Sequence, residues 1–499
     1  MHSHHHRSLP HSLYTAAQVR ELDRIAIEEQ GIPGIELMER AGRAAFDALR
    51  RRWPRLRSIA VLCGTGNNGG DGFVVARLAR QAGYELAVYQ VGDAGRIRGD
   101  ALTARRRMQE AGVEAQPLTD DVARQPVELW VDALLGTGLS GEVGGPWAQA
   151  IDTLNAARAL GAGVLALDIP SGLHADTGAV MGCAVRADLC VTFIGVKQGL
   201  LTGQGVDCCA ELSFDDLAVP AAVFERVPAA ASRLTCPDPA TALGPRRRAA
   251  HKGDYGHVLV VGGDHGMMGA ARLAGEAAAR VGAGLVSIGT RAEHATAIAG
   301  ARPELMARGV DGAPGLAPLL ARATVVAAGP GLGQGHWGRQ MLAALLQARL
   351  PLVMDADALN LLAAEPVRRD DWVLTPHPAE AARLLGVAVA DVEANRPGAA
   401  SEIQQRYGGV AVLKGAGSIV VDGVETGICS DGNPGMASGG MGDVLTGVIA
   451  GLLAQGLPAP RATRLGVCLH AAAGDRAAQA GQRGLLASDL FPVLRELMG

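Results

Sequence analysis

The chain has 499 residues, a length that suits two large domains or three ordinary ones. Its formal net charge is −4, which excludes the concentrated basic surface of a nucleic-acid-binding protein, and no run of about 18 apolar residues is present to cross a membrane. Aromatic residues make up 3 % of the chain whereas glycine contributes 68 residues, which favours closely packed α/β layers.

The eight cysteines form no CxxC pair, and no segment has the pattern of a signal peptide. We therefore expect free thiols and a cytoplasmic protein, with no nucleic acid and no membrane among its partners. The His-rich residues 2–6 are interpreted as a tail or part of a tag.

The first half of the chain alternates between helical and strand-like segments. Residues 15–52 are predicted to be helical, since apolar residues recur at helical spacing from Val19 onward. Thr15 and Gln18 form the pattern of a capping box at the start of this segment. The predicted strands that follow are 59–63, 86–91, 129–135, 164–169 and 189–194. The alternation indicates a mainly parallel sheet covered by helices on both faces.

A second alternating series begins after a stretch with little strand signal, residues 221–250. Its predicted strands are 258–261, 285–288, 325–328, 352–355, 372–375 and 410–413. No repeat relates the two halves, so the sequence predicts two different three-layer α/β domains. Their predicted bounds are 10–225 and 246–499, with a linker at 226–245.

A glycine-rich turn, residues 63–74, lies between the strand 59–63 and a helical segment. Such a turn places free N–H groups at a helix start, where they bind phosphates. Gly64, Gly66 and Gly69 satisfy the dinucleotide fingerprint, so an ordinary NAD-binding Rossmann domain is an alternative. The crowding of Asn68 and Asp71 into the turn counts against that alternative.

Three later strands of the first half also end in polar turns, around Asp132, Asp168 and Lys197. The carboxyl ends of parallel strands share one edge, where ligands bind. Asn68, Asp132 and Ser171 could there supply oxygen ligands to a hard monovalent cation, which leaves Asp168 free to act on a substrate. The alternative is that the two aspartates are helix caps or loop stabilisers.

Residues 10–220 resemble NAD(P)H-hydrate epimerase. The resemblance is carried by the segments 37–42, 66–72, 132–138 and 168–172. It implies a Rossmann-like fold and interconversion of the R and S hydrates of NADH and NADPH (NADHX and NADPHX), with a potassium ion at Asn68, Asp132 and Ser171. The implied substrate contacts are Asn67, Asn68, Gly69, Gly70, Asp71, Gly136, Thr137, Gly138, Leu139, Ser140, Gly141, Glu142 and Asp168.

The epimerisation requires few catalytic groups. The hydrate carries a hydroxyl on the carbon next to the ring nitrogen, and that nitrogen can expel the hydroxyl or open the ring. One carboxylate that handles a proton could therefore suffice, and we assign this role to Asp168. Lys197 is a weaker candidate for phosphate or proton work.

In the second half, residues 433–443 place several glycines before a helix that begins near Asp443. Bare N–H groups at that helix start would hold a transferring phosphoryl group, and Asp443 could take a proton from an attacking hydroxyl. No GxxxxGK[ST] motif occurs, so this is not a P-loop enzyme. The alternative is a tight turn with a capping aspartate.

Residues 245–499 resemble the ribokinase-like superfamily and, more closely, ADP-dependent NAD(P)H-hydrate dehydratase. The matching segments are 252–256, 262–270, 302–306, 355–360, 375–380 and 439–443. The resemblance implies hydrate contacts at Ala270, Gly331, His377 and Asp443. It implies adenine-nucleotide contacts at Lys414, Gly415, Ala416, Gly417, Ser418 and Gly442. His377, which follows Thr-Pro at a helix start, could instead be a cap.

Together the resemblances imply a bifunctional repair enzyme in which the epimerase supplies the one epimer that the dehydratase accepts. With Asp443 as base, the hydrate oxygen would attack the terminal phosphate of the co-substrate ADP, and a magnesium ion would balance the phosphates. The ring nitrogen would then expel phosphate, leaving AMP and NAD(P)H. Two alternatives stay open, a kinase for a small alcohol and a nucleotide-binding sensor. We also expect a homo-oligomer.

Overall fold

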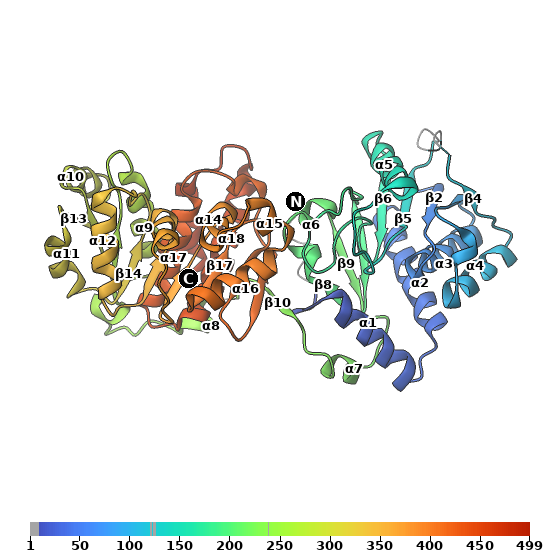
Figure 1. The fold of residues 1–499 in the computed structure, drawn as a ribbon, viewed down its shortest axis with the longest axis horizontal. Helices are drawn as coiled ribbons and strands as arrows, with labels where there is room; N and C mark the ends of the chain where they lie inside the picture. The colour runs from blue at the N-terminus through green and yellow to red at the C-terminus, as the bar shows by residue number, and fades with distance from the viewer. Residues whose placement is uncertain (1–8, 120–121, 123–125, 238) are drawn as a thin grey trace. The chain divides into compact units, whose positions relative to one another are not determined.

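The computed structural model describes residues 9–119, 122, 126–237 and 239–499, which form two compact units (Figure 1). Unit 1 extends to Arg233, and unit 2 begins at Leu234. The His-rich residues 2–6 lie outside the described residues. Each unit is described by itself below.

Unit 1 is built on a parallel sheet with the strand order β4-β3-β2-β5-β6-β7-β9. Its strands are β2 (Ser58–Cys63), β3 (Glu85–Gln90), β4 (Gln116–Pro117), β5 (Leu129–Ala133), β6 (Gly163–Leu167), β7 (Leu189–Phe193) and β9 (Leu212–Asp215). The central strands β5 and β7 are buried at every position, as expected of a parallel sheet covered on both faces. The five predicted strands of the first half are confirmed to within two residues at each end.

The helices of unit 1 are α1 (Ala16–Arg24), α2 (Gly34–Arg52), α3 (Asn67–Gln81), α4 (Gly99–Glu110), α5 (Gly145–Ala159), α6 (Gly205–Cys208) and α7 (Ala221–Glu225). The predicted capping box is confirmed, because the Gln18 N–H donates to Thr15 Oγ1 and the Thr15 N–H donates to Gln18 Oε1. The predicted helix 15–52 is interrupted: α1 continues into a π-helical turn, Ile25–Glu29, and Gly31 then adopts a φ of 70° before α2.

A short strand was missed in the stretch 221–250. There β10 (Ala231–Leu234) pairs with β1 (Ser12–Tyr14), which in turn pairs with β8 (Val196–Lys197). Four residues with only two buried positions give too short an alternation to be recognised in the sequence.

Unit 2 contains the strand order β13-β12-β11-β14-β15-β16-β17-β18-β19. Its strands are β11 (His257–Val261), β12 (Leu285–Thr290), β13 (Met306–Gly309), β14 (Val325–Ala328), β15 (Leu352–Met354), β16 (Trp372–Leu374), β17 (Val410–Leu413), β18 (Ser418–Val421) and β19 (Thr426–Cys429). Pairing is parallel from β13 to β17 and antiparallel from β17 to β19. The six predicted strands are confirmed.

The helices of unit 2 are α8 (Pro239–Leu243), α9 (Met268–Arg280), α10 (Ala292–Ala301), α11 (Ala313–Leu320), α12 (His336–Gln347), α13 (Ala356–Ala364), α14 (Pro378–Leu385), α15 (Val389–Ala394), α16 (Arg396–Tyr407), α17 (Met441–Ala454), α18 (Ala459–Ala477) and α19 (Leu490–Leu497). Helices α9 and α17 pack closely because a Cβ at Gly447 would lie 2.0 Å from the carbonyl oxygen of Ala274. Small residues in both helices therefore bring the start of α17 against α9.

Replacing Gly447 by Ala should lower the free energy of unfolding of unit 2 by about 1–3 kcal/mol, because the new methyl group meets backbone and the helices must separate. The control is Gly300→Ala in α10, where a Cβ meets nothing within 4 Å, so better helix propensity should leave stability unchanged or raised. Urea unfolding measures both variants. Equal stability of the Gly447 variant and the wild type would contradict the close packing.

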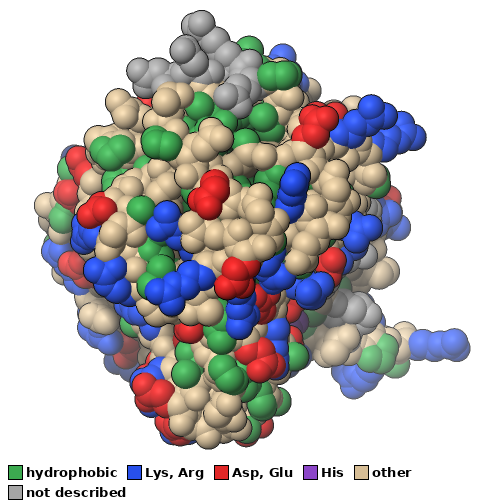
Figure 2. All heavy atoms as spheres, turned by 90° about the vertical axis from the view of Figure 1, so that its right-hand side faces the viewer, with side chains coloured by type: hydrophobic (Ala, Val, Ile, Leu, Met, Phe, Trp, Pro, Cys, Tyr) green, Lys and Arg blue, Asp and Glu red, His purple; other side chains and the backbone are tan. Residues whose placement is uncertain are grey.

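Acidic and basic side chains are interspersed on the face of the molecule seen in Figure 2. Among the described residues, no helix combines the length and the apolar character that a membrane crossing requires.

Candidate active sites

The glycine-rich turn of unit 1 joins β2 to α3, which begins at Asn67. A Cβ at Gly64 would lie 1.9 Å from the carbonyl oxygen of Leu134, and one at Gly69 would lie 2.2 Å from that of Gly64. At these positions glycine is required because the turn folds on itself and against the residues after β5. Gly66, by contrast, faces open space. The turn is thus held close to the next strand end.

A polar cradle forms where three strand ends meet, and it brings together the three predicted cation ligands. Ser171 Oγ donates to Asp132 Oδ1 at 2.6 Å, and the Ser171 N–H donates to Asp132 Oδ2 at 2.8 Å. Leu135 connects the cradle to α3, since its N–H donates to Ser171 Oγ (2.9 Å) and its carbonyl accepts from Asn68 Nδ2 (2.9 Å).

The cradle fits a hard cation. Asn68 is 6 % exposed, and its Oδ1 has no hydrogen-bond partner among the described residues. Burial raises the pKa of Asp132 to about 6, although the hydrogen bonds from Ser171 oppose this. A monovalent cation would satisfy the amide oxygen and stabilise the buried carboxylate. Elsewhere in the described part of the chain, no three His, Cys, Asp or Glu side chains converge to hold a metal ion.

Asp168 follows β6 with a φ of 65°, a left-handed conformation that is uncommon outside glycine. Its carboxylate forms an ion pair with Lys197, whose side chain is fully buried. Lys197 Nζ also donates to Thr192 Oγ1 at 3.0 Å and to the carbonyl of Phe193 at 3.1 Å. Lys197 is therefore a buried partner of Asp168, and this position does not suit the phosphate contact suggested from the sequence.

Two more carboxyl groups interact with this ion pair. Burial raises the pKa of Asp71 well above its ordinary value, and the negative charges of Asp168 and Asp23 add to the effect while Lys197 opposes it. Burial likewise raises the pKa of Asp23 to about 6. We call Asp23, Asp71 and Asp168, with Lys197, the first carboxyl cluster.

Sequence reasoning missed Asp23. It lies four residues after Val19 on α1 and therefore on the same helix face. Val19 is one of the apolar residues that recur at helical spacing in the sequence, so a carboxylate on its face was a sequence signal for a buried acidic group.

The predicted substrate segment 136–142 follows β5 and runs from half-buried to exposed. A Cβ at Gly136 would lie 3.4 Å from that of Asn68, so the segment starts beside the cradle. The contacts of its later residues with substrate stay a prediction.

In unit 2, helix α17 begins at Met441. The preceding residue, Gly440, adopts a φ of 92°. A Cβ at Gly442 would lie 3.2 Å from Lys414 Nζ and 3.3 Å from Asp355 Oδ2. Gly442 therefore lets the helix start approach these two charged groups. The structure thus brings together two parts of the predicted nucleotide site that are far apart in sequence.

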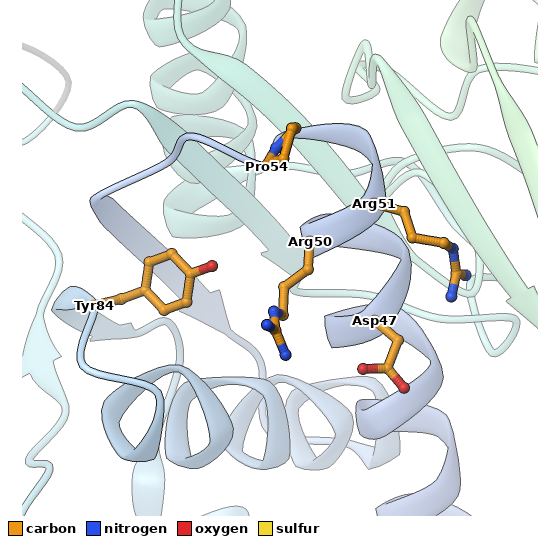
Figure 3. A pocket seen from close by; sticks show the side chains of 5 residues that line it. All are labelled: Asp47, Arg50, Arg51, Pro54 and Tyr84. Atoms are coloured by element: carbon orange, nitrogen blue, oxygen red, sulfur yellow. The ribbon is translucent and has the colours of Figure 1, made fainter.

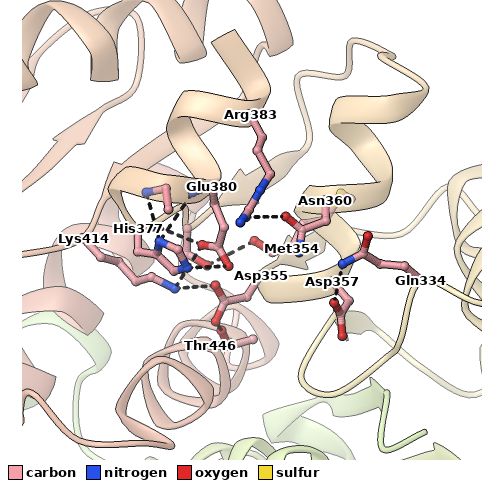
Figure 4. Close-up of polar contacts among 12 residues, drawn as sticks. Gln334, Met354, Asp355, Asp357, Asn360, His377, Glu380, Arg383, Lys414 and Thr446 are labelled. Atoms are coloured by element: carbon pink, nitrogen blue, oxygen red, sulfur yellow. Dashed lines mark hydrogen bonds and ion pairs between the residues drawn. The ribbon is translucent and has the colours of Figure 1, made fainter. Parts of the chain in front are cut away.

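Lys414 is the centre of a buried network (Figure 4). Its Nζ lies 2.5 Å from Asp355 Oδ1 and 3.8 Å from Glu380 Oε2, and Asp355 Oδ2 accepts from Thr446 Oγ1 at 2.9 Å. Burial disfavours the charged form of Lys414 and lowers its pKa, but the carboxylates of Asp355 and Glu380 outweigh this effect. The pKa of Lys414 is therefore raised above its ordinary value. The turn that follows is closed by Ser418 Oγ, which donates to the carbonyl of Gly415 at 3.0 Å.

Asp443 lies in the first turn of α17 and is partly buried. Burial raises its pKa to about 7, and the negative charges of Asp355 and Glu380 add to this while Lys414 opposes it. Such a group is half ionised near neutral pH, which suits a general base. We call Asp355, Glu380 and Asp443, with Lys414, the second carboxyl cluster.

His377 is the N-cap of α14. Its Nδ1 accepts from the N–H groups of Ala379 (3.1 Å) and Glu380 (3.4 Å), and Glu380 Oε2 accepts from the His377 N–H (2.8 Å). The capping alternative raised from the sequence is confirmed. The ring remains about half exposed, so the ligand role is compatible with capping and stays a prediction.

Ala270 lies in the first turn of helix α9, and Gly331 lies in the loop after β14. The two residues lie side by side. A Cβ at Gly331 would lie 3.4 Å from that of Ala270. The start of α17 also reaches α9 here, since a Cβ at Gly440 would lie 2.7 Å from Leu273 Cδ1. The predicted hydrate contacts Ala270 and Gly331 thus lie near one helix end.

A hollow of about 380 Å³ in unit 1 is separate from these sites (Figure 3). It is lined by Asp47, Arg50, Arg51, Pro54 and Tyr84. Pro54 and Tyr84 precede β2 and β3, so the hollow lies at the amino ends of the strands, opposite the cradle.

Two α/β units, each with a glycine-rich helix start beside a buried lysine–carboxylate pair, define a two-domain enzyme of the nucleotide-handling α/β class. Residues 34–199 match the family described as YjeF-related protein N-terminus, and residues 258–495 match that of NAD(P)H-hydrate dehydratase. The chain is 49 % identical to the bifunctional NAD(P)H-hydrate repair enzyme of Coxiella burnetii, over 97 % of this chain and 99 % of the relative. It belongs to the family of bifunctional NAD(P)H-hydrate repair enzymes.

A second relative agrees with this assignment, and a solved structure resembles about half of the chain. The bifunctional NAD(P)H-hydrate repair enzyme of Escherichia coli is 45 % identical over 98 % of this chain and 95 % of the relative. A solved structure of a hypothetical protein from Streptococcus mutans is 28 % identical, with a TM-score of 0.50, and the match covers 53 % of this chain and all of that one.

Proposed function

We propose that the chain repairs hydrated nicotinamide nucleotides through two activities. Residues 10–225 interconvert the R and S epimers of NADHX and NADPHX, and residues 246–499 return the S epimer to NAD(P)H while ADP becomes AMP and phosphate. The observation that carries the proposal is the placement of Asp168 and Asp443, each beside a lysine–carboxylate ion pair or its lysine and further acidic groups. Family membership over nearly the full length supports both assignments.

In unit 1, Asp168 is the group that handles a proton of the hydrate. Its Oδ1 is occupied by Lys197 and by the N–H of Phe193 at 3.3 Å. Among the described residues none donates to its Oδ2, so this oxygen is available to a substrate hydroxyl or water. The fixed backbone around Asp168 holds that oxygen at the carboxyl edge of the sheet, where the glycine-rich turn would hold the nucleotide.

Potassium fits the cradle of Asn68, Asp132 and Ser171, whose oxygens would hold it. The ion would supply positive charge beside the glycine-rich turn, where the phosphates of the substrate are negative. In our proposal the cradle also fixes the residues around Leu135, because Asn68 and Ser171 bond to that residue's backbone.

The variant Asn68→Ala should raise the potassium concentration needed for half-maximal epimerisation by about 10- to 100-fold, because it removes an oxygen ligand. The rate is measured against KCl, with choline chloride holding the ionic strength constant. Asn67→Ala, an exposed neighbour, should change KM without changing the potassium dependence. An identical potassium curve for the Asn68 variant would count against the cradle as the cation site.

In unit 2, Asp443 takes the proton of the hydrate hydroxyl. The hydrate oxygen then forms a bond to the terminal phosphorus of ADP, and the bond from that phosphorus to AMP breaks. The lone pair of the ring nitrogen next expels phosphate, a far better leaving group than hydroxide, and forms a C=N bond. Loss of a proton from the adjacent ring carbon then restores the ring double bond of NAD(P)H. His377, Ala270 and Gly331 would orient the hydrate for this attack.

The adenine nucleotide would be held by the Lys414–Ser418 turn and the N–H groups around Gly442. Lys414 is anchored by Asp355, so its charge is fixed beside the helix start. Among the described residues no three acidic or histidine side chains are placed to hold a metal ion. The magnesium ion would therefore be held mainly by the phosphates of ADP, whose charges it would balance.

The proposal is tested with a mixture of R and S NADPHX, followed by the absorbance of reduced nicotinamide. Full recovery of NADPH is expected with ADP and the wild-type chain. ATP in place of ADP tests the nucleotide preference, and omitting the nucleotide is the control. No recovery with either nucleotide would overturn the repair function and favour a kinase for a small alcohol.

The cellular location and the oligomeric state of the enzyme remain proposals. No disulfide joins the cysteines of the described residues, which supports a reducing, cytoplasmic location. Assembly into a homo-oligomer is testable by light scattering of the purified chain.

A further inference from the structure

Asp23 is a carboxyl group that the mechanism above does not use. It lies in the last turn of α1, and helix α1 packs on the turn between β7 and β8, since a Cβ at Gly195 would lie 3.1 Å from Val19 Cγ2. Asp23 is one helical turn after Val19 on the same face. It therefore faces the region that holds Lys197, and its charge interacts with both Lys197 and Asp168.

The first carboxyl cluster has fewer hydrogen-bond donors than carboxylate oxygens that could accept them. An ammonium group has three N–H bonds, and those of Lys197 go to Asp168, Thr192 and Phe193. Within the described residues nothing donates a hydrogen bond to the carboxyl group of Asp23 or Asp71. Three carboxyl groups therefore share one positive charge, and not all three can be ionised together at low cost.

Independent features mark the same place as a ligand site. Asn68, three residues before Asp71 at the start of α3, keeps a buried amide oxygen without a partner. Asp168 and Ile194 both adopt a positive φ, and such strained residues concentrate at functional sites. A π-helical turn begins two residues after Asp23, and such turns are frequent at functional sites as well.

An inversion at the hydroxyl-bearing carbon needs an acid and a base in opposite protonation states. The C–O bond breaks as the ring nitrogen forms a C=N bond, and the departing hydroxide must take a proton to leave as water. Water then adds to the opposite face, its proton goes to a base, and the C=N electrons return to nitrogen. Asp168, paired with Lys197, suits the base.

We propose that Asp23 is a positioning residue of this epimerisation: its negative charge keeps the cluster's proton on Asp71, the acid that protonates the departing hydroxide, while Asp168 accepts the proton of the incoming water. The inference rests on the proposed function of unit 1. Each turnover moves one proton from Asp71 to Asp168, and its return to Asp71 restores the enzyme. Asp71 interacts with the charges of Asp23, Asp168 and Lys197. Of the two neighbouring aspartates, Asp168 forms an ion pair with Lys197, whereas none is found for Asp23 among the described residues.

The test is the pH profile of epimerisation by the full-length chain, with purified S-NADPHX, no ADP, and chromatographic separation of the epimers. Asp23→Asn should lower kcat about 10-fold at pH 8 while KM stays within about threefold, because less Asp71 is protonated. The alkaline limb of the profile should move to lower pH by about one unit. Asp23→Glu, which keeps the charge, should restore the wild-type limb.

Glu28→Gln is the matched control, since it removes an exposed carboxylate from the adjacent turn and should leave the profile unchanged. An unshifted limb for Asp23→Asn, or a rate lowered equally at every pH, would overturn the inference. A melting temperature lowered as much in Asp23→Glu as in Asp23→Asn, with equal loss of rate, would assign Asp23 a merely structural role and overturn it too. A wild-type chain that interconverts no epimers would instead overturn the proposed function itself.

Discussion

Replacing Asp443 by Asn should lower the ADP-dependent dehydration of S-NADPHX by about 10³-fold or more, because the hydrate hydroxyl then has no base to take its proton. Asparagine keeps the size of the side chain and removes one of three acidic groups around Lys414, so the fold of unit 2 should survive. The rate is measured as the appearance of reduced nicotinamide absorbance at saturating ADP. Epimerisation by the same variant should be unchanged, which is the internal control.

The wild-type rate should also depend on pH in a definite direction. Asp443 acts as a base only when ionised, and its pKa of about 7 means that this form is lost as the pH falls through neutrality. The rate should be half-maximal near pH 7 and fall about tenfold for each further unit below pH 6. A residual activity of the Asp443 variant within tenfold of wild type, or a flat profile between pH 5 and 8, would remove Asp443 from the role of base.

Replacing Asp168 by Asn should lower epimerisation by about 10²- to 10⁴-fold. A mixture of R and S NADPHX with ADP would then give a fast phase from the S epimer alone, followed by a slow phase limited by spontaneous epimerisation. The wild-type chain should consume the whole mixture in the fast phase. Equal fast-phase amplitudes would contradict the assignment of Asp168.

The Asp168 variant needs a control for stability. It leaves the buried ammonium group of Lys197 without its carboxylate, which costs about 3–5 kcal/mol. The double variant Asp168→Asn, Lys197→Met removes both charges and should regain much of that stability. If activity stays low in the stable double variant, the loss is catalytic. If activity returns with stability, Asp168 is structural.

The fold was readable from the sequence because its main elements carry strong local signals. The strands β2, β5 and β7 are mainly apolar and buried, and the Thr15–Gln18 cap and the glycine turns mark helix starts. Short strands carried no such signal: β10, β13 and β19 have four residues each. Their pairing depends on neighbours that are distant in sequence.

The candidate sites were predictable only in part. Asn68, Asp132 and Ser171 were found because strand ends converge, whereas the hydrogen bonds through Leu135 are set by tertiary packing. Asp23 was missed because α1 precedes the sheet, and nothing local shows that it folds onto the turn after β7. Lys197 was a weaker candidate for phosphate or proton work in the sequence, which does not show that its three N–H groups bond to Asp168, Thr192 and Phe193.

In the second carboxyl cluster, the affinity for ADP and the rate of the chemical step should depend on pH in opposite directions. A nucleoside diphosphate that binds beside Asp355, Glu380 and Asp443 adds negative charge next to groups that already share one lysine. Its binding should therefore be accompanied by uptake of protons from solution. Burial raises the pKa of Glu380, which makes it a ready acceptor. By linkage, affinity for ADP should then weaken as the pH rises, while ionisation of Asp443 makes the chemical step faster. The pH at which the enzyme works best is thus a compromise between occupancy and turnover, and it shifts with the concentration of ADP in the cell.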